Sequence, residues 1–319
     1  MILITGAAGF IGSRLAHRLA AEGAGTLVLA DDFSRADKAP NHEALRDAVR
    51  VDRTQLWDWL RGRAHALEAV YHLGARTDTA EPDEGIFDQL NLQFSKILWR
   101  ICTEAGVPLI YASSAATYGD GSLGFSDDVS RLPQLRPLNA YARSKHAFDQ
   151  WVLEQDRTPP FWAGFKFFNV YGPGEQHKGR MASVVWHAGR QILEGGTLRL
   201  FRSHRPDCPD GGQRRDFIFV DDVVKTMRWM LMQRSACGLY NLGSGQARTF
   251  LDLGHAVFAA MGRVPDIRFI DMPADIRDSY QYFTEADMTK LRNIAFPLPF
   301  VPLEEGVRRY MQEIGLAAG

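Results

Sequence analysis

The chain has few cysteines, no long apolar run and almost no net charge, and each of these absences excludes a class of protein. Its three cysteines, Cys102, Cys208 and Cys237, lie far apart and form no Cys-x-x-Cys pair. That spacing disfavours a disulfide framework and a zinc site, and it favours a protein of the reducing cytoplasm. No apolar run approaches about 18 residues, so no membrane span is expected.

Charge is balanced over the chain, with 37 Lys and Arg residues against 38 Asp and Glu residues and a formal net charge of −1. This balance does not indicate a nucleic-acid or membrane surface as a partner. His65, His72, His177 and His187 show no paired ligand spacing, so no metal site is expected. The N-terminal "MILITG" lacks the basic segment of a signal peptide and instead predicts a buried strand.

The sequence does contain a regular alternation of strand and helix patterns. Hydrophobic residues make up 45% of its 319 positions and charged residues 24%, as in a soluble globular protein. Short apolar runs alternate with amphipathic stretches such as "FIGSRLAHRLAAEG". This pattern predicts βαβ units on a parallel sheet. The predicted strands are "MILIT", "TLVLADD", "LEAVYHLGA", "VPLIYASSAA" and "FWAGFKFFNVYG", and strand-like patterns return in "DFIFVDDVV" and "GLYNLGSG".

The first motif, "TGAAGFIG", places Gly6, Gly9 and Gly12 between a predicted strand and a predicted helix. In that position the first glycine makes a tight turn, the second lets the backbone approach a pyrophosphate, and the third allows close helix packing. The helix N-terminus then stabilises the phosphate charge. An acid is expected about 20 residues further on, at the end of the second strand, and Asp31 stands there.

These signals predict an α/β protein with a Rossmann doubly wound parallel sheet and a smaller second domain. The length exceeds what one ordinary domain core takes. A stretch rich in Gly, Pro, Arg and His, including "RPDCPDGGQRRD", interrupts the alternation and predicts a loop. We expect the cofactor-binding domain to comprise residues 1–172 plus about 214–245. We expect a mixed α/β substrate-binding domain to comprise about 173–213 plus 246–319.

The choice between NAD and NADP is left open by the residues after the second strand. Asp31 and Asp32 are acids that accept the adenosine ribose hydroxyls, which favours NAD, and they would repel a 2′-phosphate. Arg35 and Lys38 lie a few residues further on and could hold that phosphate.

The second motif, "YARSK", pairs Tyr141 with Lys145 at a spacing that puts both on one helix face. A nearby ammonium favours the tyrosinate and lowers the tyrosine pKa, which gives a base near neutral pH. The same lysine can bind ribose hydroxyls of a nicotinamide nucleotide. Upstream, Ser113 and Ser114 end a predicted parallel strand, where ligands bind. A serine there can hydrogen-bond the substrate oxygen that Tyr141 deprotonates.

The glycine turn, Asp31, Ser114, Tyr141 and Lys145 together resemble the extended short-chain dehydrogenase/reductases, Rossmann enzymes that act on nucleotide-linked sugars. Longer stretches are similar to one family among them, the ADP-L-glycero-D-manno-heptose 6-epimerases of bacterial lipopolysaccharide core synthesis. These stretches are "YASSAATYG", "FFNVYGPGEQHKGRMASV", "RRDFIFVDDV", "YNLGSG" and "YQYFTEADMTKLR". The resemblance covers essentially the whole chain. It implies an ADP-heptose substrate and a cytoplasmic homo-oligomer, with a homopentamer as the form expected from the family.

The resemblance also implies which residues form the site. The residues implied to be catalytic are Ser114, Tyr141, Lys145 and Lys178. The residues implied to bind the dinucleotide are Gly6, Gly9, Phe10, Ile11, Gly12, Asp31, Asp32, Lys38, Leu73, Gly74, Ala75, Asn91, Tyr141, Lys145, Val170 and Lys178. The residues implied to bind the sugar nucleotide are Ser114, Asn169, Arg180, His187, Phe201, Arg202, Ser203, His204, Arg215 and Tyr280. The lysine at position 38 favours NADP, with NAD as the alternative.

Two features depart from the family pattern beside the expected pocket. The connection "SHRPDCPDGGQ" is longer than in the family, and Arg180 replaces a serine. Arg180 is expected to hold a diphosphate, with pairing to a loop carboxylate as the alternative.

The implied reaction removes a hydride from C6 of the heptose and returns it to the other face of a 6-keto sugar. The hydroxyl points in opposite directions before and after, so a proton acceptor is needed on each side. Tyr141 serves one side and, by the resemblance, Lys178 in "HKG" serves the other. Burial and the neighbouring His177 or Arg180 can lower the lysine pKa.

Other functions stay open at this point. A related 4-epimerase needs no second base at Lys178. A 4,6-dehydratase carries an Asp-Glu pair where this chain has Ala115 and Ala116, so the groups for elimination are absent. A non-catalytic dinucleotide-binding sensor has no need for Ser114, Tyr141 and Lys145 together.

Overall fold

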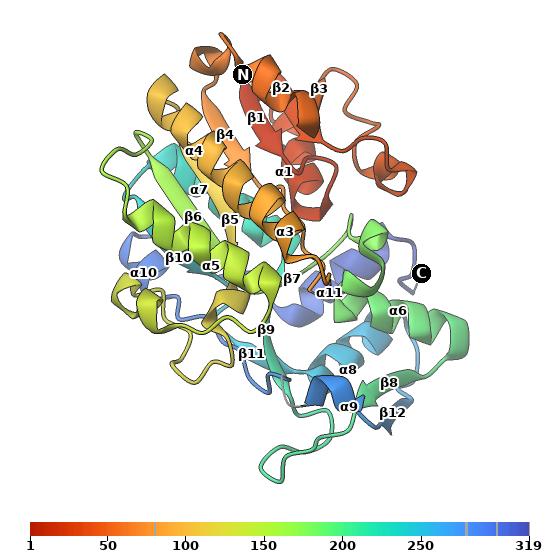
Figure 1. Cartoon of the computed structure of the whole chain (residues 1–319). Coiled ribbons are helices and arrows are strands. Elements are labelled where there is room, and N and C mark those ends of the chain that lie inside the picture. Colours follow the sequence, from red (N-terminus) through yellow and green to blue (C-terminus); the bar gives the residue numbers. More distant parts are fainter. Residues whose placement is uncertain (80, 278–279, 298, 319) are drawn as a thin grey trace.

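The structure, a computed structural model, describes residues 1–79, 81–277, 280–297 and 299–318. Its larger lobe is built on a seven-stranded parallel sheet in the order β10-β6-β5-β4-β1-β2-β3 (Figure 1). The chain starts at β1 and its strand order reverses between β1 and β4, which confirms the predicted Rossmann fold. The strands are β1 (Ile2–Thr5), β2 (Leu27–Asp31), β3 (Val49–Asp52), β4 (Ala69–His72), β5 (Leu109–Ser114), β6 (Trp162–Phe167) and β10 (Gly238–Leu242).

Helices cover both faces of this sheet, because its strands are apolar on both sides (Figure 1). The helices α4 (Phe94–Ala105) and α5 (Ala140–Leu153) lie on one face, and α1 (Phe10–Ala21) and α7 (Val220–Gln233) pack together on the other. Short helices complete the lobe: α2 (Leu56–Leu60), α3 (Glu84–Phe87) and α10 (Thr289–Asn293). None of the described helices is long and apolar enough to cross a membrane.

Local sequence explains where the helices that border the site begin. The side chain of Asn139 accepts a hydrogen bond from the Ala142 nitrogen at 2.8 Å and caps α5. The hydroxyl of Ser183 caps α6 (Val184–Gly195) by accepting from the Trp186 nitrogen at 3.2 Å. Each cap satisfies a backbone N–H that has no partner inside its helix.

The smaller lobe contains two short sheets and the remaining helices (Figure 1). In the first sheet, β9 (Arg214–Phe219) pairs in parallel with β7 (Asn169–Tyr171) and antiparallel with β11 (Ala247–Thr249). In the second, β8 (Leu198–Phe201) pairs in parallel with β12 (Ile267–Ile270). Its own buried apolar cluster lies between α6, α8 and α11. The helices are α6, α8 (Phe250–Ala260), α9 (Ala274–Arg277) and α11 (Leu303–Glu313).

Several strands differ from the sequence prediction: β3, β8, β11 and β12 were not predicted, and one predicted strand is divided in two. The strand β3 was not predicted, because its residues alternate charge with valine and only Val51 is buried. The single run "FWAGFKFFNVYG" forms two strands, β6 in the large sheet and β7 in the small one. The chain therefore passes from one lobe to the other between Phe167 and Asn169. The predicted loop "RPDCPDGGQRRD" is confirmed over residues 205–213, whereas its last three residues, 214–216, belong to β9.

Candidate active site

A cleft of about 540 Å³ lies where the carboxyl ends of β1, β2 and β4 meet. A Cβ on Gly6 would lie 2.6 Å from the Gly74 nitrogen, and one on Gly12 would lie 2.1 Å from the Gly6 carbonyl oxygen. These approaches exclude a side chain, and the cradle fits the pyrophosphate of a dinucleotide at the start of α1. The predicted cofactor-binding residues in its lining are Gly6, Gly9, Phe10, Ile11, Gly12, Asp31, Asp32, Lys38, Leu73, Gly74, Ala75 and Lys178.

At the end of β2 the structure compensates the acids with cations. Asp31 accepts hydrogen bonds from the Ala8 nitrogen at 2.9 Å and from Lys38 Nζ at 2.8 Å. Arg53, which follows β3, lies 3.7 Å from Asp32 and lines the same cleft. Arg53 was not predicted as a site residue, because the strand before it, β3, was not predicted. The ribose end of the cleft therefore carries the cations Arg35, Lys38 and Arg53 around its two acids.

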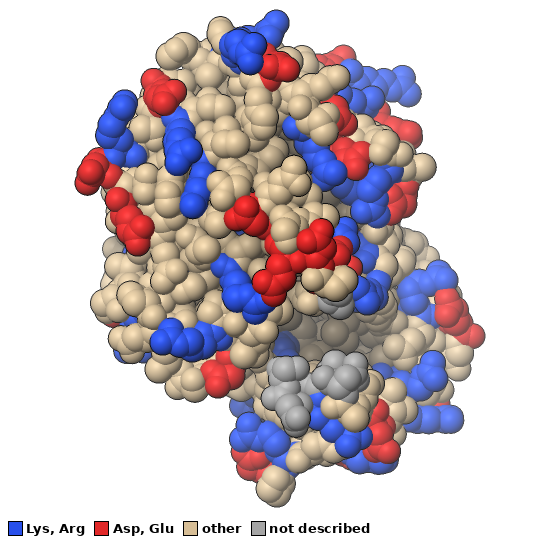
Figure 2. Space-filling view, in the orientation of Figure 1, with Lys and Arg blue, Asp and Glu red and all other residues tan. Residues whose placement is uncertain are grey.

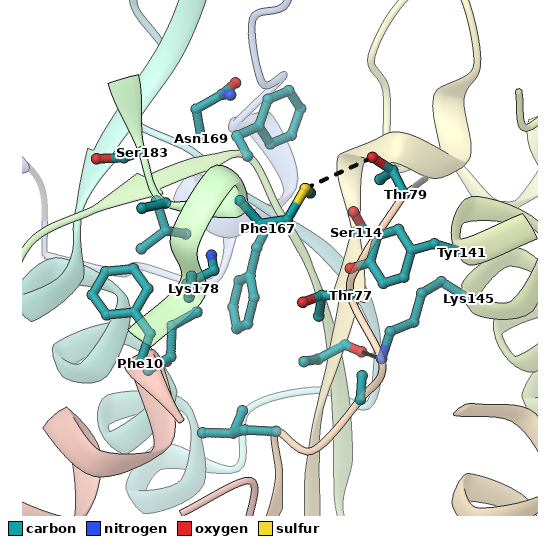
Figure 3. A pocket seen from close by; sticks show the side chains of 18 of the residues that line it. Phe10, Thr77, Thr79, Ser114, Tyr141, Lys145, Phe167, Asn169, Lys178 and Ser183 are labelled. Carbon is teal, nitrogen blue, oxygen red and sulfur yellow. Dashed lines mark hydrogen bonds between the residues drawn. The ribbon is translucent and has the colours of Figure 1, made fainter. Parts of the chain in front are cut away.

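A second cavity of about 330 Å³ adjoins the cleft, and both are lined by Phe10, Leu73, Ala75 and Lys178. Tyr141 and Lys145 enter it from α5, and Ser114 enters it from the end of β5 (Figure 3). Lys178 faces these residues from the opposite side (Figure 3). The two candidate bases, Tyr141 and Lys178, therefore border one space. Figure 2 shows the surface between the two lobes hollowed, with cationic and acidic side chains at its rim.

The direction of the Tyr141 pKa shift differs from the sequence expectation. Burial raises the pKa of Tyr141, and the adjacent Ser114 hydroxyl opposes this rise. Burial lowers the pKa of Lys145 to about 8, and the carboxylate of Asp149 opposes that shift. Lys145 Nζ donates to the Ala112 carbonyl oxygen at 2.8 Å. The expected lowering of the tyrosine pKa by Lys145 is therefore wrong for the protein alone, because desolvation of the phenol is the larger effect.

A buried ion pair lies behind the Tyr141 side. Lys166 on β6 donates to Asp149 of α5 at 2.6 Å, and both side chains are at most 1% exposed. Asp149 also accepts from the hydroxyls of Ser113 and Tyr111, at 2.6 and 3.1 Å. One carboxylate thus joins α5 to β5 and β6 directly behind the strand end that carries Ser114. The sequence analysis did not single out Asp149 or Lys166, although Asp149 stands four residues after Lys145 on the same helix.

Lys178 lies on a short helical turn, residues 176–181, which is interrupted at Gly179 with φ of +53°. Its Nζ lies 5.5 Å from the centre of the Phe10 ring and forms no hydrogen bond or ion pair with any described residue. Burial lowers the pKa of Lys178, while Glu175 opposes this shift. The side chain is therefore free to meet a ligand, and its lowered pKa makes it a more accessible base than an ordinary lysine.

Arg180 turns away from the Tyr141 cavity and forms an ion pair across the cofactor cleft. Its Nη2 donates to both carboxylate oxygens of Asp78, at 2.8 and 2.9 Å. Beside it, the Thr79 hydroxyl lies 4.0 Å from the Met181 sulfur (Figure 3). The turn 176–181 is thus connected to the loop after β4. The structure shows the alternative named for Arg180, pairing with a loop carboxylate.

Two predicted cofactor-binding residues lie behind the cleft or beside it. Asn91 is buried, accepts from the Arg76 nitrogen at 2.8 Å, and donates to the Arg76 carbonyl oxygen and the Ser144 hydroxyl. It therefore holds the loop after β4 against α5 and does not line either cavity. Val170 lines the Tyr141 cavity, as does the predicted substrate residue Asn169.

Several predicted substrate-binding residues gather in the smaller lobe. Arg215 is buried between the rings of Phe250 and Tyr280, at 5.6 and 5.2 Å from their centres. Phe201 meets Tyr280 edge-on at 6.3 Å. Arg215 forms no ion pair with any described carboxylate, so its charge is available to an anionic ligand.

The remaining predicted substrate residues form hydrogen bonds or ion pairs within the smaller lobe. His187 is on α6, where its nitrogen donates to the Ser183 carbonyl oxygen. Arg202 pairs with Asp271 at 2.9 Å. The nitrogens of Ser203 and His204 donate to Asp210 and to the Tyr282 hydroxyl. The predicted substrate residues outside the lining of the Tyr141 cavity are Arg180, His187, Phe201, Arg202, Ser203, His204, Arg215 and Tyr280, and their contacts with substrate stay predictions.

Comparison with known proteins agrees with this geometry. A model of the "NAD dependent epimerase/dehydratase family" matches residues 2–243. The chain is 46% identical over 320 aligned residues to an ADP-L-glycero-D-manno-heptose-6-epimerase of Nitratidesulfovibrio vulgaris, covering 100% of this chain and 99% of the relative.

Solved structures of similar fold include the ADP-L-glycero-D-manno-heptose-6-epimerase of Helicobacter pylori. It superposes with a TM-score of 0.82 and 26% identity, covering 98% of this chain and 96% of that one. The UDP-glucose 4-epimerase of Thermus thermophilus, solved in complex with NAD, gives a TM-score of 0.79 and 26% identity, with 99% of each chain covered.

Proposed function

The chain belongs to the NAD dependent epimerase/dehydratase family, and from this premise we propose that it inverts C6 of the heptose in ADP-D-glycero-D-manno-heptose to give ADP-L-glycero-D-manno-heptose. One observation carries the proposal. Tyr141 and Lys178 border one cavity from opposite sides, and that cavity adjoins a dinucleotide cleft. An epimerase that works through a ketone needs a proton acceptor on each face of the reacting carbon.

The chain's own residues have distinct tasks in this reaction. A nicotinamide cofactor held in the cleft by Gly6, Gly9, Asp31 and Lys38 would supply the hydride acceptor and donor for C6. Tyr141 takes the hydroxyl proton of one epimer, while Ser114 donates a hydrogen bond to the same oxygen. Lys178 takes the proton of the other epimer. The sugar must turn between the two steps, so we propose that the pocket holds the ADP half firmly, through cations such as Arg215, and the heptose loosely.

We propose NADP as the cofactor, with NAD as the alternative. Lys38 compensates Asp31, and Arg53 lies near Asp32, so the acids that would repel a 2′-phosphate are paired. Arg35 adds a third cation to the same lining.

Titration of each cofactor into stripped protein tests this choice. Lys38→Ala and Arg53→Ala should each weaken NADP binding by about tenfold or more, as expected for loss of a charge-assisted phosphate contact, and change NAD binding little. Arg50→Ala is the control, because Arg50 donates to the His42 carbonyl oxygen and does not line the cleft. Equal or tighter binding of NAD by the unaltered protein would mean that the acids control the site.

The proposal includes a cytoplasmic homo-oligomer, as the family resemblance implies, and the division of the chain into cofactor-binding and substrate-binding domains as given above. The two separate buried apolar clusters support a division into two lobes, but not each boundary. Ala286, Met288, Leu291 and Phe296 pack in the cluster of the larger lobe, and Phe217 and Phe219 pack in that of the smaller lobe.

The decisive experiment is incubation of the protein with ADP-D-glycero-D-manno-heptose in deuterated water. The product should have the inverted C6 configuration and no carbon-bound deuterium at C6, because the hydride stays within one site. Deuterium at C6 would rule out direct hydride return, and deuterium at C5 or C7 would indicate an enolising route. UDP-glucose serves as the comparison substrate, and faster turnover of UDP-glucose would favour a 4-epimerase.

A further inference from the structure

Glu175 is a fully buried carboxylate that takes no part in the reaction as described so far. Its side chain is 0% exposed, although it stands in a connection between two lobes where most neighbours are at least partly exposed. Burial raises its pKa, and the hydrogen bonds from Ser183 oppose the rise. A buried carboxylate is costly to keep unless its oxygens are satisfied.

The oxygens of Glu175 join the two ends of the segment that carries Lys178. One oxygen accepts from the Gly172 nitrogen at 3.3 Å and from the Ser183 hydroxyl at 2.6 Å. The other accepts from the Ser183 nitrogen at 2.5 Å. The segment 172–183 leaves β7 at one end and enters α6 at the other. One side chain therefore closes it into a loop.

Lys178 itself is held only by its backbone and by packing. Its nitrogen donates to the Glu175 carbonyl oxygen at 2.9 Å, which begins the turn 176–181. Its Nζ has no hydrogen-bond partner among the described residues and lies over the Phe10 ring at 5.5 Å. The position of the amine in the cavity thus depends on the loop beneath it, and the loop is closed by Glu175.

We propose that Glu175 is the positioning residue of Lys178, holding the segment 172–183 closed so that the amine faces Tyr141 across the cavity. This inference rests on the proposed function, in which Lys178 is one of two bases. The carboxylate also supplies the negative charge that acts on Lys178 from within its own loop. Other described ionisable groups border this loop at His177, Arg180 and Asp78, but Arg180 and Asp78 pair with each other across the cofactor cleft.

The change Glu175→Gln keeps the volume of the side chain but disrupts the hydrogen bonds that close the segment 172–183. An amide has one acceptor oxygen, so its nitrogen would meet either the Ser183 N–H or, in the other orientation, the Gly172 N–H, while the Ser183 hydroxyl can turn to accept. Two donors face to face push the loop open. A displacement of about 1 Å can cost about 10²-fold in rate, so we expect an effect of that size on the step that uses Lys178.

The two epimers separate this effect from a general loss of structure. Holoenzyme in excess is mixed rapidly with each C6 epimer, and the first appearance of reduced nicotinamide is followed by absorbance. Lys178→Met identifies the epimer whose oxidation needs Lys178. Glu175→Gln should slow that epimer by about 10²-fold and leave the other, which uses Tyr141, within about twofold of the unaltered enzyme.

Asp222→Asn is the matched control. Asp222 is also a buried carboxylate. It stands on α7, outside the segment 172–183, and accepts a hydrogen bond from the Val301 nitrogen at 2.7 Å. This variant should oxidise both epimers at unaltered rates. If Glu175→Gln does not fold, as judged by circular dichroism, Ser183→Ala decides the matter. It removes one of the three bonds to Glu175 together with the hydroxyl that caps α6, and it should slow the same epimer by a smaller factor than Glu175→Gln does.

The results of this experiment distinguish a failure of the positioning role of Glu175 from a failure of the two-base function on which it rests. Equal slowing of both epimers by Glu175→Gln, or no slowing of either, would overturn the positioning role. If Lys178→Met itself shows no preference between the epimers, the two-base function fails instead.

Discussion

Tyr141 and Lys178 border one cavity, yet the chain holds them in different ways. Tyr141 stands on α5, whose backbone bonds are internal, and its partner Ser114 ends β5, which is paired on both sides with β4 and β6. Behind them a fully buried ion pair, Lys166 with Asp149, ties helix to sheet. Lys178 stands on an irregular turn between the lobes, broken at Gly179.

This difference shows how one site combines a fixed side and an adjustable side. The Tyr141 side is held by long-range contacts inside one lobe, which should keep its geometry constant. The Lys178 side is held by one carboxylate, Glu175, by hydrogen bonds from Asn41 to Gly174 and His177, and by one surface ion pair, Arg180 with Asp78. A substrate that must show both faces needs such an asymmetry, because a sugar gripped tightly on both sides could not turn. The predictions below test that asymmetry, from the largest effect to the smallest.

The largest effect should come from removing either base. Tyr141→Phe and Lys178→Met should each reduce epimerisation by about 10²–10⁴-fold, the usual contribution of a general acid or base. Cofactor should stay bound in both, which absorbance of the purified protein can report. Near-normal epimerisation by Lys178→Met would show Lys178 to be an ordinary loop lysine and would remove the comparison altogether.

The next effect should come from breaking the buried pair behind Tyr141. Lys166→Met leaves Asp149 charged, buried and without its cation, so the free energy of unfolding should fall by about 3–5 kcal/mol in urea titrations. Lys166→Arg should recover most of this loss, because it keeps the charge. Lys290→Met is the control, since Lys290 is only half-buried and donates to a single carbonyl oxygen, that of Leu239. Equal losses for Lys166→Met and Lys290→Met would contradict the prediction.

A smaller effect should appear on acidification, and it should involve both sides of the site. Burial lowers the pKa of His72 to about 3 and that of His177 to about 4. Between pH 6.5 and 4 these histidines are protonated in the unfolded chain but neutral in the folded chain. Their contribution to the free energy of unfolding is therefore present above pH 6.5 and is lost as the pH falls. Each histidine should contribute about 1–2 kcal/mol between pH 7 and pH 5.

Urea titrations at these two pH values measure the slope. His177→Asn should reduce it by the share of one histidine, because asparagine does not titrate. His65→Asn is the control, because His65 is exposed on a short surface turn and its replacement should leave the slope unchanged. An unchanged slope in His177→Asn would show that the turn 176–181 does not resist protonation in the folded protein.

The smallest effect should come from opening the surface ion pair that crosses the cofactor cleft. Arg180 is 64% exposed in its side chain, and exposed pairs contribute about 0.5–1 kcal/mol, so Arg180→Ser should speed cofactor release by only about two- to fivefold. Salt should speed release from the unaltered protein more than from Arg180→Ser, because salt screens exposed charges. Arg143→Ser, which breaks an exposed pair with Glu84, is the control and should release cofactor at the normal rate. A much larger change in substrate affinity than in cofactor release would favour the predicted diphosphate contact of Arg180.

Much of the fold could be predicted because it depends on local patterns. The run "MILIT", the glycine turn and the helix after it form β1, the cradle and α1 as expected. The strand β3 could not be predicted, because an edge strand buries little and its pattern is weak. The division of "FWAGFKFFNVYG" between two sheets could not be predicted either, since the run continues without a turn signal and the two parts differ in the strands they pair with.

The sequence by itself determined the residues whose chemistry follows from spacing. Tyr141 and Lys145 share a helix face because they are four residues apart, and the three glycines form a cradle because they stand between a strand and a helix. Only the tertiary structure decided what these groups meet. It paired Lys38 with Asp31, and it paired Arg180 with Asp78, 102 residues away. It also put Lys178 opposite Tyr141. Contacts between distant segments depend on how the two lobes are packed against each other, which no local pattern records.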